Sequence, residues 1–201
     1  ITPTLAELVA LRALAGGRRL ADIVRRAVGG GVTCVQLRAK TASSRALLAQ
    51  ARELVALLRP MGVPLIVNDR LDIALAADAD GLHIGQDDLP CAIARRLVRP
   101  AFCIGVSVST VAEALAAEAE GADYLGVSPV FDTPTKRDTP AATGLDGLRA
   151  IRAATRLPLV GIGGMNAGNS AAVRTAGADG IAVVSAILAA EDPAAAARRL
   201  R

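Results

Sequence analysis

A recurring unit constrains the fold of this chain more than any other feature. A helical stretch leads into a turn rich in Gly, Ala and Asp, and a short apolar run follows, as in AVGGGVTCVQLR, AADADGLHIGQ, AEGADYLGVSP and AGADGIAVVSA. Two more runs, VPLIVND and LPLVGIGG, begin after a proline, and CIGVSVS completes a set of seven. Short apolar runs without polar alternation are typical of parallel strands that are covered on both faces.

Helical segments separate these runs. Residues 44–58 carry apolar side chains at helical spacing, and residues 110–120 follow Ser109, a candidate N-cap. Repeated strand–helix units predict a closed (β/α)8 barrel, a TIM barrel, with residues 1–201 as a single domain. Because the chain starts at Ile1-Thr2-Pro3, we expect its first strand to be largely missing from this sequence or to lie before its first residue. A doubly wound open sheet is the alternative architecture.

Composition narrows the classes of function. The chain is 52% hydrophobic and 21% charged, which is typical of a compact soluble protein, and its net charge of +4 comes from scattered arginines. Two Phe, one Tyr and no Trp leave little that could stack on bases, so we expect no nucleic-acid partner. The apolar runs fall short of a membrane span, and the chain shows no cationic and apolar leader. We therefore expect a cytoplasmic protein without a membrane partner.

Cysteine and histidine usage argues against a zinc centre. Cys34, Cys91 and Cys103 form no CxxC pair and lie among apolar neighbours, so we expect buried, reduced thiols. His83 is the only histidine. Without a second histidine or a GxSxG motif, a Ser-His-Asp nucleophile has almost no support. We interpret His83 as a hydrogen-bonded histidine inside the barrel.

Polar residues and glycines follow the apolar runs. In both architectures ligands bind at the carboxyl ends of the strands, where these residues would gather. They are Gln36, Arg38 and Lys40; Asn68 and Asp69; Gln86, Asp87 and Asp88; Ser107; Thr133, Thr135 and Lys136; Gly163 and Gly164; and Ser185. The sequence therefore predicts a charged binding site at one mouth of the barrel.

The segment SPVFDTPTKRDTP, residues 128–140, contrasts with the rest of the chain. Its three prolines and four charged residues exclude a regular helix or a buried strand, so we predict a loop. The loop carries Lys136, one of only two lysines; the other is Lys40, and every other cationic residue is an arginine. Both lysines fall in loops of the predicted site, which suggests catalytic roles for them.

The segment GIGGMNAG, residues 161–168, follows a strand and opens a helix. It nearly matches the dinucleotide fingerprint, but Asn166 takes the third glycine position and no acidic residue follows at the expected spacing. In a barrel, the turns after the last two strands often bind phosphate through main-chain N–H groups. Gly163-Gly164 and Val184-Ser185 lie in these turns, so we predict a phosphate site. A tight glycine turn without a ligand is the alternative.

Two aspartates suggest a metal. Asp69 and Asp88 end different strands, and two carboxylates together with water and phosphate oxygens suit Mg²⁺. The alternative for Asp69 is that it caps the helix of RLDIALAADA. Arg38 and Lys40 project to one side at the end of their strand, where they either bind an anion or remain solvated.

Taken together, the motifs VQLRAK, VND, GLHIGQDD, GVS, SPVFDTPTK, GIGG and VSAI occur in the order and with the spacing of the thiamine phosphate synthase family. The chain resembles this family over nearly its whole length. The resemblance implies a TIM-barrel transferase that joins 4-amino-2-methyl-5-hydroxymethylpyrimidine diphosphate to 4-methyl-5-(2-hydroxyethyl)thiazole phosphate. Pyrophosphate would leave in a dissociative, Mg²⁺-assisted substitution that needs no strong general base.

The resemblance also assigns roles to residues. Contacts to the pyrimidine diphosphate would come from Gln36, Arg38, Lys40, Asn68, Ser107 and Lys136, of which Arg38, Lys40, Ser107 and Lys136 would be catalytic. Mg²⁺ would be held by Asp69 and Asp88. The thiazole phosphate would be held by Thr133, Thr135, Gly164, Val184 and Ser185.

The chain departs from the family pattern at two places. Of the usual first strand, YLVTD, only Ile1-Thr2 would remain, and Ala39 and Thr41 stand where the family usually has acidic residues. A thiazole tautomerase-like paralogue and a non-catalytic module that binds a phosphate ligand are the alternative functions. Assembly into a homo-oligomer is left open.

Overall fold

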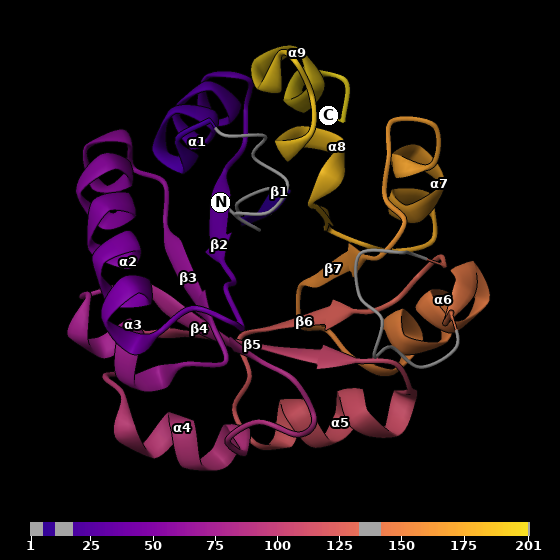
Figure 1. The fold of residues 1–201 in the computed structure, drawn as a ribbon. Coiled ribbons are helices and arrows are strands. Elements are labelled where there is room, and N and C mark those ends of the chain that lie inside the picture. The colour runs from indigo at the N-terminus through magenta and orange to yellow at the C-terminus, as the bar shows by residue number, and fades with distance from the viewer. Residues whose placement is uncertain (1–5, 11–17, 133–141, 201) are drawn as a thin grey trace.

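Eight parallel strands form a closed barrel in the computed structural model, which describes residues 6–10, 18–132 and 142–200. The strands are β1 Ala6–Ala10, β2 Cys34–Leu37, β3 Leu65–Asn68, β4 Gly81–Ile84, β5 Cys103–Val108, β6 Tyr124–Val127, β7 Leu159–Ile162 and β8 Gly180–Val183. Each strand pairs with its neighbours in chain order, and Figure 1 shows the helices arranged around them. The predicted TIM barrel is confirmed, and the open sheet is excluded.

The first strand differs from our expectation. We expected it to be largely missing, but Ala6–Ala10 forms β1. Glu7 aligns with Cys34 of β2 on one side and with Ala182 of β8 on the other, so β1 closes the barrel. The segment AELVA is short and contains a charged residue, unlike the other apolar runs. Its strand conformation follows from pairing with residues that are distant in sequence.

The helices follow the strands in chain order. They are α1 Leu20–Gly29, α2 Ser44–Leu58, α3 Leu71–Ala76, α4 Cys91–Leu97, α5 Val111–Ala119, α6 Gly144–Ala154, α7 Ser170–Thr175, α8 Ser185–Leu188 and α9 Pro193–Arg198, with a 3₁₀ turn at Arg59–Met61. The predicted helix over residues 44–58 is confirmed as α2.

The N-cap of α5 is a second correction. Thr110, not Ser109, caps this helix, because the Thr110 hydroxyl accepts a hydrogen bond of 3.2 Å from the N–H of Glu113. Ser109 instead donates to the Glu113 carboxylate through its N–H and its hydroxyl, at 2.6 and 3.0 Å. The Glu side chain thus reaches back over the helix start, much as in a capping box.

The recurring Gly/Ala/Asp turn ends the helices before β2, β4, β6 and β8. Before β6, Gly121 has φ +91°, and the N–H groups of Gly121 and Ala122 return to carbonyls of α5 at 3.1 and 3.0 Å. This arrangement satisfies the last carbonyls of a helix and needs a left-handed residue, which glycine supplies without strain. Gly31 and Gly177 take the same position in their turns, and Asp78 takes it with φ +54°.

Three of these turns end in an aspartate that ties two strands together. The hydrogen bonds run from Leu65 N–H to Asp80 at 2.8 Å, from Ile104 N–H to Asp123 at 2.7 Å and from Leu159 N–H to Asp179 at 2.8 Å. All three lie where strands begin, at the end of the barrel away from the predicted site. Residues at that end of a TIM barrel contribute to stability rather than to catalysis.

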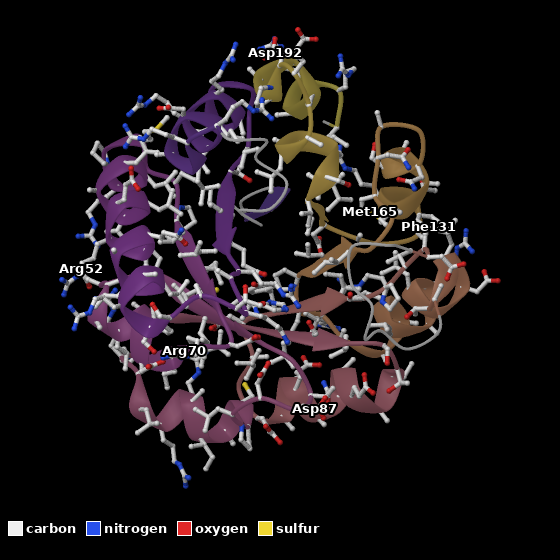
Figure 2. All side chains as sticks on the ribbon, in the orientation of Figure 1. Arg52, Arg70, Asp87, Phe131, Met165 and Asp192 are labelled. Atoms are coloured by element: carbon white, nitrogen blue, oxygen red, sulfur yellow. The ribbon has the colours of Figure 1, made fainter. Side chains whose placement is uncertain are left out.

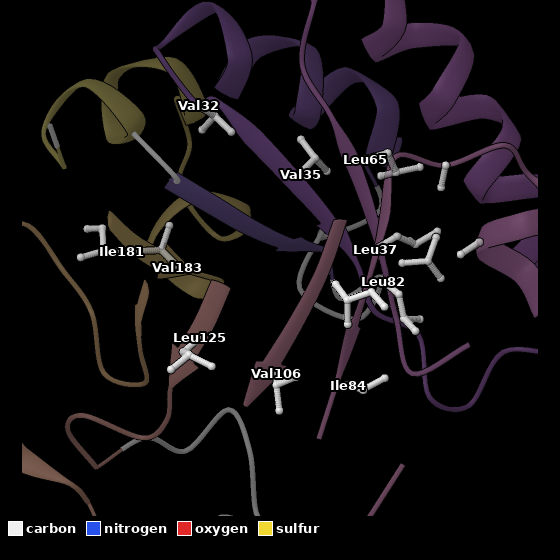
Figure 3. Packing of buried hydrophobic residues seen from close by; sticks show 14 of the residues in the cluster. Val32, Val35, Leu37, Leu65, Leu82, Ile84, Val106, Leu125, Ile181 and Val183 are labelled. Atoms are coloured by element: carbon white, nitrogen blue, oxygen red, sulfur yellow. The ribbon is translucent and has the colours of Figure 1, made fainter. Parts of the chain in front are cut away.

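Successive residues of the strands pack into two separate cores. Outward-facing residues such as Val35, Leu65 and Leu82 pack under the helices (Figure 3). Inward-facing residues form a smaller cluster inside the barrel, with Tyr124, Val160, Ile162 and Ala182. Because residues on both faces of β2 to β8 are largely buried, these runs are apolar without alternation, as the sequence indicated.

Many charged side chains lie on the outside of the helices. Figure 2 shows Arg52 on α2 and Asp192 at the start of α9, both pointing away from the barrel. None of the helices in the described ranges combines the length and the apolar character that a bilayer crossing would require.

Candidate active site

The carboxyl ends of β2, β3 and β4 bring four of the predicted site residues together. Lys40 and Asp69 form an ion pair, with Nζ 3.5 Å from Oδ2. Asp88 lies close enough to raise the pKa of the Asp69 carboxyl, and Arg38 lies close enough to lower it. Two cations and two carboxylates from three strand ends therefore share one part of the barrel mouth.

The backbone of Asp69 is held in an unusual conformation. Its φ is +64°, which is uncommon for a residue other than glycine, and its N–H donates to the carbonyl of His83 at 2.8 Å. Helix α3 begins at Leu71, and Arg70 is its N-cap residue, without a side-chain capping bond. The helix-cap interpretation of Asp69 is therefore excluded. Backbone strain of this kind is concentrated at functional sites.

The charge state of Asp69 is set by its surroundings. Burial raises the pKa of the Asp69 carboxyl above its usual value of 3.8, and the hydrogen bond and negative charge of Asp88 raise this pKa further. Lys40 and Arg38 act in the opposite direction. The net rise shows that the two cations do not fully offset the cost of holding two carboxylates together.

This pair of carboxylates fits Mg²⁺ better than a transition metal. In residues 6–10, 18–132 and 142–200, no cluster of three or more His, Cys, Asp or Glu side chains could hold a metal ion. Zinc sites need at least three such ligands, whereas Mg²⁺ is commonly held by one or two carboxylates, water and substrate phosphates. A divalent cation would also relieve the repulsion between Asp69 and Asp88.

A cavity of about 160 Å³ opens beside the carboxylates. Its polar lining consists of Lys40, Asn68, Asp69 and Arg70, and Leu47 of α2 contributes to its apolar lining. Whole sites for small molecules usually exceed about 300 Å³. The cavity is thus the size of a subsite for one charged group.

A hydrogen-bonded network lies inside the barrel, below this mouth. His83 Nδ1 is 2.8 Å from the Tyr124 hydroxyl, and His83 Nε2 is 2.8 Å from the Ser107 hydroxyl. Gln86 donates from Nε2 to the carbonyl of Ser107 at 2.7 Å. The interpretation of His83 as a hydrogen-bonded barrel residue is confirmed, because the ring is 3% exposed and both nitrogens have partners.

Gln36 and Asn68 lie at different depths. Gln36 is buried inside the barrel on β2, where it aligns with Ile66 of β3. Asn68 is the last residue of β3, is half-buried and lines the cavity. Only Asn68 of the two is therefore placed at the cavity itself.

The predicted phosphate turns lie at the ends of the adjacent strands β7 and β8. Gly163 and Gly164 both have positive φ, +97° and +66°, and the Gly164 carbonyl accepts from Asn169 at 2.9 Å. Val184 precedes α8 and Ser185 is its first residue, so the Ser185 N–H has no partner within its helix. These turns form an arrangement that suits an anion, although glycine turns also occur without one.

The segment that follows β6 runs past the Gly163-Gly164 turn. Phe131 donates from its N–H to Gly163 at 3.3 Å, and a Cβ at Gly164 would lie 2.8 Å from the Cβ of Phe131. Figure 2 labels Phe131, near α6. The predicted site residues Thr133, Thr135 and Lys136 lie outside the described residues.

Two site residues were missed by sequence reasoning. Arg70 lines the cavity, and its position directly after Asp69 in VNDR could have indicated this from the sequence. It is already engaged, donating to Asp72 at 2.6 and 2.8 Å and to the Ser44 hydroxyl at 2.8 Å. Tyr124 was missed because the run YLGV shows nothing that separates an inward tyrosine from an ordinary core residue.

Comparison with known proteins adds to this geometry. The family model described as thiamine monophosphate synthase matches residues 7–187. The chain belongs to this family. A match of this extent includes seven barrel strands in full and most of β1, together with the described site residues.

Individual members of the family are similar over nearly the full chain. A thiamine-phosphate synthase of Albidiferax ferrireducens is 54% identical, with 98% of this chain and 95% of the relative covered. Another, of Chloroflexus aurantiacus, is 56% identical over 94% of this chain and 87% of the relative. The solved structure of a thiamine phosphate pyrophosphorylase from Pyrococcus furiosus is similar with a TM-score of 0.89 and 39% identity, covering 98% of this chain and 93% of that one.

Proposed function

We propose that this chain is a thiamine-phosphate synthase, a transferase that joins a pyrimidine diphosphate to a thiazole phosphate and releases pyrophosphate. The observation that carries the proposal is the cluster of Arg38, Lys40, Asp69 and Asp88 at one barrel mouth. It occurs in a chain that is 54–56% identical to proteins named thiamine-phosphate synthase.

In the proposed reaction the bond between the pyrimidine methylene carbon and the diphosphate oxygen breaks first. Its electron pair leaves with the pyrophosphate, and the aminopyrimidine ring stabilises the methylene cation. The thiazole nitrogen then forms the new C–N bond with a lone pair that is already free. No proton is transferred in either step, so the reaction needs no general base.

The residues of the chain would act mainly on the leaving group. Arg38, Lys40 and Lys136 would offset the charge that develops on the diphosphate. Asp69 and Asp88 would hold a magnesium ion, which would supply further charge neutralisation for the leaving group. Gln36, Asn68 and Ser107 would orient the pyrimidine diphosphate, since alignment of two bound substrates lowers the barrier by itself.

The second substrate would bind at the other side of the mouth. We propose that Gly164, Val184 and Ser185 hold the thiazole phosphate mostly through the backbone, with hydroxyl groups from Thr133 and Thr135. The tautomerase-like alternative is not supported by Asp69 and Asp88, because a tautomerase would not be expected to need carboxylates that hold a metal. A binding module without catalysis is not supported either, because the similar proteins named above are named as synthases.

We also propose that the protein is located in the cytoplasm. Cys34 and Cys91 are buried and Cys103 is half-buried, and all three are reduced thiols. Burial raises the pKa of the Cys91 thiol, which makes it less reactive. Reduced thiols are the usual state inside cells.

A crystal structure with pyrophosphate, Mg²⁺ and thiazole phosphate would test the map of the site. Pyrophosphate should lie near Lys40 and Asp69, with the thiazole phosphate beside it at Gly164 and Ser185. Density for either ligand away from the carboxyl ends of the strands would contradict the proposal.

A further inference from the structure

The network of Tyr124, His83 and Ser107 links the adjacent strands β4, β5 and β6 on the inner side of the barrel. The two hydrogen bonds of the imidazole are both 2.8 Å long, and His83 and Tyr124 are 3% and 2% exposed. Ser107 is half-buried at the upper end, where the mouth begins. The three side chains thus connect the core with the predicted substrate site.

Two glycines make room for this network. A Cβ at Gly105 would lie 2.0 Å from Cζ of Tyr124, and a Cβ at Gly126 would lie 2.9 Å from Cε1 of His83. Any other residue at either position would displace one of the rings. The barrel interior is therefore shaped around the tyrosine and the histidine, which argues against a chance contact.

The direction of the hydrogen bonds decides what Ser107 can offer to a ligand. A neutral imidazole has one N–H donor and one acceptor nitrogen, and a serine hydroxyl donates only one hydrogen. If Nε2 of His83 were the acceptor, the Ser107 hydrogen would point into the core and only lone pairs would face the mouth. If Nε2 carries the hydrogen, the Ser107 hydrogen remains available to a ligand.

The charge of the mouth favours the second arrangement. Arg38 and Lys40 lie at this end of the barrel, and the proposed substrate carries a diphosphate. An anionic oxygen needs donors and is repelled by lone pairs. With Nε2 protonated, Nδ1 is the acceptor, and the Tyr124 hydroxyl is 2.8 Å away to donate to it.

We propose that His83 is a positioning residue that makes Ser107 a hydrogen-bond donor to the anionic substrate. Tyr124 donates to Nδ1, Nε2–H donates to the Ser107 oxygen, and the Ser107 hydroxyl donates to an oxygen of the bound diphosphate. His83 itself does not touch the reacting atoms and exchanges no proton. The proposal rests on the proposed function, because it takes the diphosphate from there.

The tautomer of His83 can be read without any turnover. His83 is the only histidine, so ¹⁵N-histidine labelling of the tag-free protein gives signals from one imidazole. We expect a neutral ring protonated at Nε2, and a change in the Nε2 signal when Mg²⁺ and pyrophosphate are added. That change should be absent in Ser107→Ala. A ring protonated at Nδ1, or at both nitrogens, would overturn the proposal.

Kinetics of a matched pair of variants test the same point in catalysis. His83→Gln keeps an N–H donor near the place of Nε2, whereas His83→Met fills a similar volume without one. We expect kcat/KM to fall about tenfold or more in His83→Met and about threefold or less in His83→Gln. Equal losses in the two variants would overturn the proposal, since only the shape of the side chain would then matter.

A double-mutant cycle separates positioning from stability. Because His83 acts through Ser107, the variant with both Ser107→Ala and His83→Met should be about as slow as Ser107→Ala alone. Val160→Ala, a loss of volume in the same interior cluster, should combine additively with Ser107→Ala. Independent effects of His83 and Ser107 would contradict the proposal. Absence of turnover in the unaltered protein would instead refute the proposed function and leave the NMR result to decide this one.

Discussion

Lys40 Nζ lies 3.5 Å from Asp69 Oδ2, and this ion pair joins the ends of the neighbouring strands β2 and β3 at the barrel mouth. The side chain of Lys40 is 57% exposed and that of Asp69 is 20% exposed, so the lysine covers a carboxylate that is largely withdrawn from water. An exposed ammonium on a flexible stem can leave this carboxylate and follow a phosphate group.

The first prediction concerns that lysine. Lys40→Arg keeps the charge but replaces a compact ammonium with a planar guanidinium, which prefers a fixed bidentate partner. We expect unchanged stability and a kcat lowered at least roughly tenfold, about 1.4 kcal/mol of transition-state stabilisation. Arg52→Lys on the outer face of α2 is the control and should leave kcat unchanged. Wild-type kinetics in Lys40→Arg would show that only the charge matters.

The second prediction concerns the stability of the metal-free protein. Because burial and Asp88 raise the pKa of Asp69, the folded state keeps a proton there that the unfolded chain loses. Stability should therefore fall as the pH rises from 3.8 through the folded-state pKa. Asp69→Asn should abolish this fall and raise the Tm at pH 7 in excess chelator. Asn is chosen because it tolerates the left-handed backbone at this position. Thermal unfolding followed by circular dichroism measures both effects.

Asp72→Asn is the matched control for that experiment. Arg70 lowers the pKa of the exposed Asp72 carboxyl, so its charged form is favoured in the folded state. Loss of the Asp72 charge should reduce the free energy of unfolding by no more than about 0.5 kcal/mol, because the ion pair is exposed. Mg²⁺ should raise the Tm of the wild-type protein and of Asp72→Asn but not that of Asp69→Asn. A Tm that is lower in Asp69→Asn than in the wild-type protein would contradict the account of this site.

The third prediction concerns the aspartates where strands begin. Asp123→Ala removes the acceptor of the Ile104 N–H, which lies in a fully buried residue, and an unsatisfied buried donor costs about 1–3 kcal/mol. Urea unfolding should show this loss, while kcat per folded molecule stays unchanged. Asp146→Ala on α6 is the control, because its side chain is 99% exposed. A loss of kcat in Asp123→Ala would contradict the assignment of this end of the barrel to stability.

The fourth prediction compares the two phosphate turns. At Gly164 a side chain would meet Phe131 and the carbonyl of Asp132 at 2.8 and 2.9 Å, with φ at +66°. Gly164→Ala should therefore cost about 1–2 kcal/mol of stability and weaken thiazole phosphate binding, and Gly164→Val should be worse. Ser185→Ala should weaken that binding by only about 1 kcal/mol, because main-chain donors remain.

Gly29→Ala serves as the control for the glycine variants. A Cβ at Gly29, the last residue of α1, meets nothing within 4 Å, so this change should be neutral or stabilising by up to about 1 kcal/mol. Calorimetry with thiazole phosphate measures the binding differences. Equal binding losses in Gly164→Ala and Ser185→Ala would contradict a turn that binds through its backbone.

Much of the fold was predictable because it rests on local signals. The strands β2 to β8 follow from apolar runs buried on both faces, and the turn at Gly121 follows from the need for a left-handed residue. By contrast, β1 contains Glu7 and is a strand only because β2 and β8 lie beside it. Either Thr110 or Ser109 could cap α5 by residue type. The hydrogen bonds of Glu113 distinguish them, because its N–H donates to Thr110 while its carboxylate accepts from Ser109.

The candidate site was predictable to a similar depth. The rule that ligands bind at the carboxyl ends of strands indicated Lys40, Asp69 and Asp88 together. The left-handed backbone of Asp69 was not predictable, because it depends on a hydrogen bond to β4. The contact between His83 and Tyr124 could not be predicted, because it depends on the register of the strands and on the space left by Gly105.

The most direct test of the central claim is product formation by the purified chain. With pyrimidine diphosphate, thiazole phosphate and Mg²⁺, we expect thiamine phosphate and pyrophosphate in equal amounts, measured by chromatography and a coupled pyrophosphate assay. Excess chelator should abolish turnover, and added Mg²⁺ should restore it. No thiamine phosphate from both substrates would contradict the proposed function, and full turnover in excess chelator would contradict the role of Asp69 and Asp88.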